Sequence, residues 1–155
     1  GGHCIAVDPW FIVEASPDDA RLIKMARSVN DGKPSFVLDK VLEAVSTTGK
    51  NISGLSIACL GLAFKSNIDD LRGSPALLIS QEVASMGFKS TLLVEPNIDD
   101  LPGSFLGKNV ILSDLEEAIR SADIVLLLVD HMSFKSMDLG LLTGKQIIDT
   151  RGIWV

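Results

Sequence analysis

Apolar residues in the first third of the chain recur at the three- and four-residue spacings of an amphipathic helix. Leu22, Met25 and Val29 fall on one face of such a helix. Ser16 followed by Pro17 predicts that it begins at Ser16, because serine is a favoured N-cap and proline is tolerated at the first helical position. The pattern therefore predicts a helix that starts at Ser16 and runs toward position 31.

A second amphipathic run follows between Phe36 and Val45. Gly32 and Pro34 separate the two runs, and we expect them to kink or break the helix, because glycine is a poor helix former and proline lacks a backbone N–H. Thirty helical residues would span about 45 Å. An element of this length has few local partners in a chain of 155 residues, so we expect it to bury one face against another copy of the chain or another domain.

The pattern changes after a polar boundary at residues 47–54, where short apolar runs begin to alternate with helical patterns. The helical patterns cover residues 74–87 and 113–122, and Ser113 with Glu116 has the spacing of a capping box. The apolar runs, which we expect to be strands, cover residues 55–61, 90–96, 109–113, 123–130 and 145–151. Three of them are nearly continuous in Val, Ile and Leu, which is typical of strands buried on both faces. We therefore predict an α/β fold with a Rossmann-like, mostly parallel sheet and flanking helices, preceded by the long helical segment.

Composition narrows the classes of partner. The formal net charge is −6 and no cluster of Lys and Arg with interleaved aromatic residues occurs, so nucleic acid is not an expected partner. The longest apolar run, residues 124–129, is too short to span a bilayer, and the N-terminus does not resemble a secretory signal, so we expect no membrane partner and a cytoplasmic location. Of the two cysteines, Cys59 lies in an apolar strand pattern and is expected to be a small buried residue.

The loop after the first predicted strand, GLAFKSNIDDLRGSPA at residues 61–76, gathers charge just before a helix start. Ligands bind beyond the carboxyl ends of parallel strands, and a helix N-terminus is a natural seat for phosphate, so Lys65 and Arg72 are candidate phosphate contacts. The alternative is a solvated loop in which Asp69 or Asp70 pairs with Arg72. The local pattern leaves both interpretations open.

Arg151 is the last residue of the final predicted strand and should lie at the same edge of the sheet. Its planar guanidinium would suit a second phosphate or the edge of a base, although an arginine near a terminus is usually a surface residue. No GxGxxG or GxxxxGK[ST] motif occurs, so the residues give no support for an independent dinucleotide or ATP site.

The first ten residues, GGHCIAVDPW, place a cysteine among small residues. Nearby backbone N–H groups lower the pKa of a thiol and favour its reactive thiolate, so Cys4 is a candidate nucleophile. Gly1 would let a substrate approach the backbone closely, and Asp8 would share a face with Cys4 if the segment were helical. A nearby carboxylate would raise the pKa of the thiol, so we expect Asp8 to act on water or on a cation instead. His3 and Cys4 lack the further ligands of a metal site, and the simpler interpretation of the segment is a loop leading into a helix.

Three separated motifs, GGHCIAVDPWF, GLAFKSNIDDLRGSP and the terminal IIDTRGIW, resemble in sequence and order those of the UDP-glucose/GDP-mannose dehydrogenase family. The chain as a whole resembles the C-terminal part of such an enzyme. The resemblance implies NAD as cofactor, a UDP-sugar as substrate, and two oxidations of the sugar C6 alcohol through a thiohemiacetal and a thioester. It also implies that residues 1–50 form a catalytic-cysteine loop and a central helix that makes a homodimer through residues 17–48. Residues 51–155 would then form the UDP-sugar-binding domain.

The resemblance also assigns roles to individual residues. Cys4 would be the nucleophile, and Asp8 would assist water and proton transfer. The other implied roles are substrate binding by Gly1, Phe64, Lys65 and Arg151, and contact with NAD by Arg72. No metal is implied.

The chain departs from the family pattern at two points. It reads DLRGSP where the family commonly has DLRESP, so Gly73 removes a carboxylate beside Arg72. It also lacks the N-terminal NAD-binding domain, together with the lysine and asparagine that complete the family's active site. We therefore expect this chain to be inactive by itself. The alternatives are a stand-alone UDP-sugar-binding or dimerisation module, and an α/β domain without ligand affinity.

Overall fold

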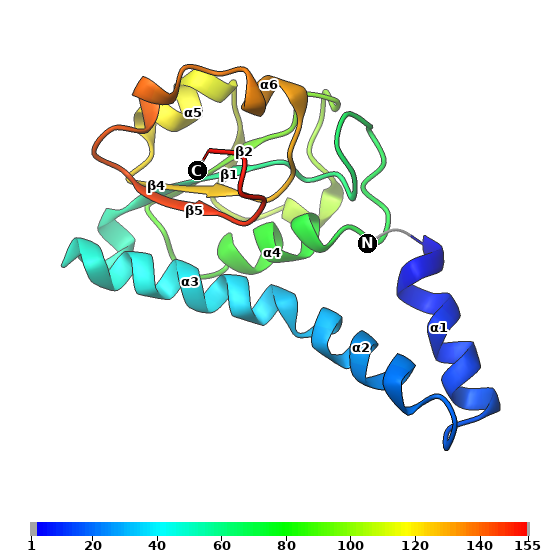
Figure 1. Ribbon diagram of the computed structural model, residues 1–155. Helices are drawn as coiled ribbons and strands as arrows, with labels where there is room; N and C mark the ends of the chain where they lie inside the picture. Colours follow the sequence, from blue (N-terminus) through cyan, green and yellow to red (C-terminus); the bar gives the residue numbers. More distant parts are fainter. Residues whose placement is uncertain (1–2, 155) are drawn as a thin grey trace.

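A five-stranded parallel sheet forms the centre of the fold in the computed structural model, which describes residues 3–154 (Figure 1). The strands lie in the order β3-β2-β1-β4-β5, and all four pairings are parallel. Their bounds are β1 Ser56–Leu60, β2 Ser90–Val94, β3 Val110–Leu112, β4 Ile124–Leu127 and β5 Gln146–Asp149. Each strand lies within the apolar run that predicted it, so the predicted parallel α/β sheet is confirmed.

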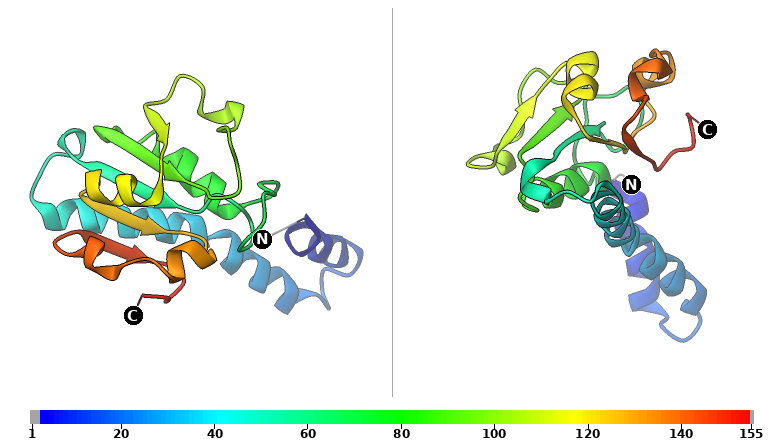
Figure 2. Two further views of the ribbon diagram at one scale, coloured as in Figure 1. Left: turned by 90° about the horizontal axis from the view of Figure 1, so that it is seen from above. Right: turned by 90° about the vertical axis from the view of Figure 1, so that its left-hand side faces the viewer.

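Helices cover both faces of this sheet, with α3 and α4 on one face and α5 and α6 on the other (Figures 1 and 2). The α-helices are α1 His3–Ala15, α2 Arg21–Asp31, α3 Lys33–Thr48, α4 Pro75–Val83, α5 Leu115–Ser121 and α6 Met132–Lys135. Short 3₁₀ helices span Ile52–Gly54, Gly103–Phe105 and Leu139–Leu142. Within residues 3–154, none of the helices combines the length and the apolar composition needed to cross a membrane.

The strands are apolar on both sides because each side packs against its own layer of helices. Successive side chains of a strand point to opposite faces, so Ile57 and Cys59 pack with α3 and α4, whereas Ala58 and Leu60 pack with α5 and α6. All four side chains are fully buried. Burial also raises the pKa of the Cys59 thiol to about 12, which makes it an inert part of the core, as expected.

Two helices, α1 and α2, form a hairpin that extends away from the sheet (Figures 1 and 2). α2 continues into α3 with a break at Gly32, whose φ of −78° and ψ of −10° remain in the right-handed helical region. Pro34 lies in the first turn of α3, where its missing N–H leaves no helical hydrogen bond unmade. The predicted kink in one long helical segment is therefore confirmed.

The prediction that a helix begins at Ser16 is wrong, and so is the expectation of a loop before it. α1 already occupies the residues from His3 to Ala15, and α2 begins only at Arg21. The Ser16 hydroxyl donates a hydrogen bond to Asp19 Oδ2 at 2.8 Å and does not cap a helix. The N-cap of α2 is Ala20, which has no side-chain oxygen to accept a backbone N–H.

The predicted capping box at α5 is also absent. The N-cap of α5 is Asp114, one residue later than expected, and its side chain accepts no capping hydrogen bond. The Ser113 hydroxyl instead donates to the backbone carbonyl of Asp114 at 3.3 Å. This helix is held by the packing of Ala118 and Ile119 against the sheet, which is a stronger determinant than a cap.

Candidate functional site

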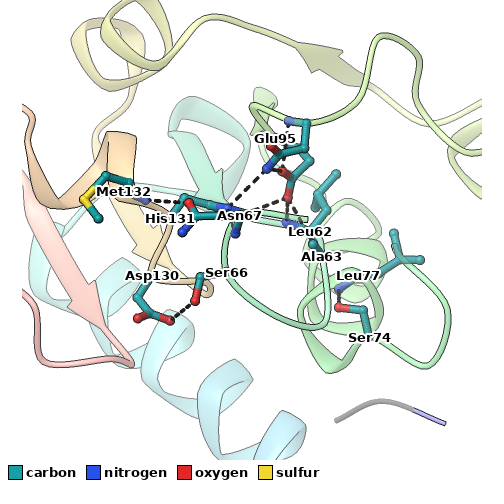
Figure 3. Close-up of polar contacts among 11 residues, drawn as sticks. Leu62, Ala63, Ser66, Asn67, Ser74, Leu77, Glu95, Asp130, His131 and Met132 are labelled. Carbon is teal, nitrogen blue, oxygen red and sulfur yellow. Dashed lines mark hydrogen bonds and ion pairs between the residues drawn. The ribbon is translucent and has the colours of Figure 1, made fainter. Parts of the chain in front are cut away.

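Polar side chains from three loops meet at the carboxyl edge of the sheet, in a network whose two hydrogen-bonded parts are joined through the adjacent residues Ser66 and Asn67 (Figure 3). The β1–α4 loop, residues 61–74, contributes Ser66 and Asn67. Glu95 follows β2, and Asp130 with His131 follows β4. Segments far apart in the sequence are thus tied together at the edge where parallel sheets bind ligands.

Glu95 is the buried anchor of this network, and its side chain has no exposed surface. Its Oε2 accepts the backbone N–H groups of Leu62 at 2.8 Å and Ala63 at 3.0 Å. Burial by itself would raise the pKa of this carboxyl, but hydrogen bonds from His131 and the two backbone N–H groups outweigh burial and lower the pKa to about 2. Glu95 is therefore ionised at neutral pH and fixes the start of the β1–α4 loop.

His131 connects Glu95 to the middle of the same loop. Its ring is almost fully buried, with Nε2 3.1 Å from Glu95 Oε2, and its Nδ1 accepts the backbone N–H of Asn67 at 2.9 Å. Because Nδ1 accepts, Nε2 carries the proton and donates to the carboxylate. A second hydrogen bond joins the same two segments, because Asn67 Oδ1 accepts the backbone N–H of Met132 at 2.9 Å. Asn67 has a φ of 60°, a left-handed conformation uncommon outside glycine, which these two hydrogen bonds hold in place.

Asp130 links the loop to the end of β5. Its Oδ1 accepts hydrogen bonds from Arg151 Nη2 at 2.8 Å and Nε at 3.2 Å, and from the Ser66 hydroxyl at 3.3 Å. Its Oδ2 accepts Lys135 Nζ at 2.6 Å. The hydrogen bond from Lys135, followed by that from Arg151, outweighs partial burial, so the pKa of the Asp130 carboxyl lies well below its ordinary value.

The predicted substrate-binding residues Phe64, Lys65 and Arg151 lie around this network. Phe64 is half-buried, and the exposed Lys65 lies between it and Ser66. The side chain of Lys65 makes no hydrogen bond or ion pair with any residue in the described range 3–154. Arg151 is exposed just beyond β5 and reaches the loop through Asp130. The structure thus brings the loop and Arg151 together, as the position of both at one sheet edge predicted.

Arg72, the predicted cofactor contact, is held inside its own loop. Its Nε and Nη2 donate to the two carboxylate oxygens of Asp70 at 2.9 Å and 2.8 Å. Of the two interpretations that the sequence left open, the internal ion pair is therefore present. The side chain is still 77% exposed, so the guanidinium is accessible from outside.

Cys4 and Asp8 lie one helical turn apart in α1, and both are exposed. The helix therefore places them on one face, as the four-residue spacing predicted for a helical segment. Cys4 is a free thiol. Gly1 lies outside the described residues. In the described part of the chain, no group of three or more His, Cys, Asp or Glu side chains could hold a metal ion.

A groove of about 1230 Å³ is lined by residues of both α1 and the end of β5. Ala6 borders it from α1, Gly73 and Ser74 from the start of α4, and Arg151 from the end of β5. Ser74 caps α4 by accepting the backbone N–H of Leu77 at 3.2 Å (Figure 3). The helix that carries Cys4 and the arginine at the sheet edge therefore share one concave surface, which is the usual form of a ligand site.

Three residues of this site were not predicted from the sequence: Glu95, Asp130 and His131. Glu95 directly follows an apolar run in the stretch VEP, and Asp130 with His131 follows one in the stretch VDH. That position was the available signal, because polar residues at the carboxyl ends of parallel strands face the ligand-binding edge.

Comparisons with known proteins place these observations in a family. The sequence profile of the UDP-glucose/GDP-mannose dehydrogenase family, UDP binding domain, matches residues 58–155. The UDP-N-acetyl-D-mannosamine dehydrogenase of Salmonella typhi is 50% identical over 158 residues, covering 99% of this chain and 37% of that protein. The NDP-N-acetyl-D-galactosaminuronic acid dehydrogenase of Ralstonia nicotianae is 51% identical over 154 residues, covering 99% of this chain and 35% of that protein.

Solved structures give the same relationship. The UDP-D-ManNAc dehydrogenase from Pyrococcus horikoshii matches with a TM-score of 0.79 at 31% identity, covering 99% of this chain and 35% of that one. The chain therefore spans about a third of the length of the relatives that it matches.

Proposed function

Because the chain belongs to the UDP-glucose/GDP-mannose dehydrogenase family, we propose that it binds the UDP part of a UDP-sugar and, within a longer protein, oxidises that sugar at C6. The observation that carries the proposal is the meeting of Arg151 with the loop of Phe64 and Lys65, at the edge of the domain whose counterpart in the family binds UDP. Two cationic side chains at one edge suit the two phosphates of UDP.

The proposed substrate is UDP-N-acetyl-D-mannosamine, converted to UDP-N-acetyl-D-mannosaminuronate. The names of the Salmonella and Ralstonia relatives both specify an N-acetylated sugar. Their identities of 50% and 51% with this chain support the choice of this substrate class over UDP-glucose.

Cys4 is the proposed nucleophile for the second oxidation. After C6 has lost a hydride and the hydroxyl its proton, the Cys4 thiolate forms a C–S bond to the aldehyde carbon, the carbonyl oxygen takes up a proton, and a thiohemiacetal results. Loss of a second hydride from C6 and of the proton from the thiohemiacetal hydroxyl gives a thioester on Cys4. Water then adds to the thioester and the C–S bond breaks, which releases the carboxylate and returns the thiol. Asp8, one turn along α1, would accept the proton of this water.

NAD supplies the hydride acceptor for both oxidations when it is bound. The described residues fit this cofactor only in part, because Arg72 alone is assigned to it and Asp70 already holds that side chain. The exposed Arg72 guanidinium suits a cofactor carried mainly by another domain, and this chain alone would then be inactive. Gly1 would line the sugar site beside Cys4.

A homodimer through residues 17–48 is part of the same proposal. The exposed apolar side chains of α2 and α3 support it, because those of α2 recur at the three- and four-residue spacing of one helical face and the one of α3 follows seven residues later. They are Leu22, Met25, Val29 and Phe36, each of them more than half exposed. The proposed location of the protein is the cytoplasm.

Titration calorimetry of UDP and of UDP-N-acetylmannosamine into the chain tests the binding role. Lys65→Ala and Arg151→Ala should each weaken UDP binding roughly tenfold or more, because a hydrogen bond to a charged group contributes about 1.5–3 kcal/mol. Lys89→Ala is the matched control, an exposed lysine just before β2, at the opposite edge of the sheet. Absence of UDP binding to the unmodified chain, or equal binding by all the variants, would contradict the proposal.

The alternative is a stand-alone UDP-sugar-binding or dimerisation module without catalysis. Mixing the chain with the separately produced N-terminal domain of a relative, NAD and the UDP-sugar distinguishes the two. NADH formation that is lost in Cys4→Ser supports the dehydrogenase. UDP binding without NADH formation in the mixture favours the module.

A further inference from the structure

We propose that Asp130 is a positioning residue for recognition of the nucleoside diphosphate: it fixes the direction of the Arg151 side chain and ties it to the loop that carries Lys65. The inference rests on the proposed function and adds to it a residue with no assigned role. Asp130 acts through its neighbours, because its carboxylate is occupied by protein groups on both oxygens.

The contact with Arg151 restricts the guanidinium more than a single hydrogen bond would. Nε and Nη2 both donate to Oδ1, at 3.2 Å and 2.8 Å, so one edge of the planar group faces Asp130. The side chain remains 46% exposed, and its remaining N–H groups are available to a ligand. A free arginine loses rotamer entropy when it is fixed, so Asp130 removes part of this cost before the ligand binds.

The same carboxylate oxygen reaches the β1–α4 loop. Oδ1 accepts the Ser66 hydroxyl at 3.3 Å, and the next residue of each segment pairs as well, through the Asn67 N–H and His131 Nδ1 at 2.9 Å (Figure 3). Two consecutive residues of the loop are therefore matched to two consecutive residues after β4. Since Lys65 directly precedes Ser66, the spacing between Lys65 and Arg151 is set through Asp130.

The charges are arranged so that a carboxylate can lie near a diphosphate. Lys135 pairs with Oδ2 at 2.6 Å and Arg151 pairs with Oδ1, so two cations surround one anion and leave a net positive charge. Without Asp130, Lys135 and Arg151 would repel each other, and Arg151 would leave its present direction.

UDP titration of Asp130→Ala, Arg151→Ala and the double variant tests the inference. Asp130→Ala should weaken UDP binding about tenfold, the equivalent of about 1.4 kcal/mol of lost preorganisation. In the Arg151→Ala background the same change should weaken binding threefold or less, because the residue that Asp130 positions is already gone. Equal losses in the two backgrounds, or no loss in the single variant, would overturn the inference.

Asp123→Ala is the matched control. Asp123 directly precedes β4, whereas Asp130 follows it, so the two carboxylates lie at opposite ends of the strand. Asp123 pairs with Lys50 and accepts the backbone N–H of Ser56. It should leave UDP affinity unchanged, and thermal unfolding of every variant separates a loss of affinity from a loss of folded protein.

A second readout does not depend on UDP. The Arg151 Nε–H should give a distinct, slowly exchanging NMR signal that disappears in Asp130→Ala and persists in Asp123→Ala. An unmodified chain that fails to bind UDP contradicts the proposed function. An Arg151 signal that is unchanged in Asp130→Ala contradicts the positioning role itself.

Discussion

At the scale of single residues, the candidate site depends on carboxylates whose partners come from other elements. Glu95 holds two backbone N–H groups of the β1–α4 loop and a histidine from the turn after β4. Asp130 holds side chains from three different segments. Loss of either carboxylate should therefore act on the arrangement of the loops, and for Glu95 also on stability.

Glu95→Gln should lower the free energy of unfolding at pH 7 by about 2–4 kcal/mol, because a buried amide cannot satisfy all the donors that face the carboxylate. Urea unfolding measures the change. Glu117→Gln, an exposed glutamate of α5, is the control and should change stability by less than about 0.5 kcal/mol. Equal stabilities of the two variants would show that the network contributes nothing.

Stability should also depend on pH through Glu95. Its folded pKa of about 2 lies below its ordinary value of 4.5, so between these values the unfolded chain binds more protons than the folded chain. The contribution of Glu95 is then fully present above pH 4.5 and is lost as the pH falls toward 2. Urea unfolding at a series of pH values should show a shallower acid loss in Glu95→Gln, and parallel curves for the two proteins would contradict this account.

The residues of this network show where prediction from sequence stops. The location of Lys65, Arg72 and Arg151 at one edge could be predicted, because each follows a strand whose apolar run is unmistakable. The pairing of Glu95 with His131 could not, because the two residues are 36 positions apart and nothing in either local stretch specifies the other. Burial determines that pairing, and burial depends on the completed fold.

At the scale of elements, the strands and the start of α4 at Ser74 were predicted well, but the starts of α2 and α5 were not. A strand buried on both faces is a continuous apolar run, so its position along the chain can be predicted from composition. Ser16 would have started a helix only if its hydroxyl accepted a backbone N–H, but it donates to Asp19 instead, and α2 begins at Arg21. α1 was missed for another reason, because it has apolar residues on all sides, including the exposed Ile5, Phe11 and Ile12. Such a helix has no amphipathic period from which it could be predicted.

Gly61 marks the point where β1 ends against the turn after β4, and Gly61→Ala should be strongly destabilising. Its φ is +94°, and an added Cβ would lie 2.4 Å from Val129 Cβ and 2.9 Å from the backbone N of Val129. We expect a loss of about 3 kcal/mol or more in urea unfolding. Gly49→Ala, with a φ of +67° but nothing within 4 Å, is the control and should cost only about 1 kcal/mol. Similar losses of unfolding free energy for the two variants would mean that Val129 moves aside at little cost, and would contradict this prediction.

At the scale of the whole molecule, the helical hairpin of α1 and α2 is the part that leaves a row of large apolar side chains exposed. The sheet domain has two buried apolar cores, one on each face of the sheet, and single exposed apolar side chains such as Leu106. In α2, by contrast, the exposed Leu22, Met25 and Val29 lie along one face of the helix. This contrast agrees with the expectation that the long helical segment packs against another copy of the chain.

Leu22→Lys should convert the proposed dimer to a monomer while leaving the fold intact, because the side chain is exposed in the single chain. Burial of one leucine stabilises by about 1.5–3 kcal/mol, and a symmetric dimer contains it twice, so the dissociation constant should rise at least about a hundredfold. Sedimentation velocity measures the change. Leu106→Lys is the control, since Leu106 is 85% exposed and follows the 3₁₀ helix at Gly103–Phe105, in the sheet domain. A monomeric unmodified chain, or a dimer that survives Leu22→Lys, would contradict the proposal.

Because α2 meets α3 at the kink at Gly32, a small change of angle there would move the far end of the hairpin by a larger distance. α2 has 11 residues, so its far end lies about 16 Å from the hinge. A rotation of about 2° at Gly32 would move that end by about 0.5 Å, which is already the positional tolerance of a catalytic group. Because α1, with Cys4, is joined to that end, the position of the Cys4 thiol relative to the sheet domain depends on the stiffness of the kink at Gly32. If Cys4 is the nucleophile, as proposed, a contact that stiffens the hairpin would change the reaction rate without touching the substrate.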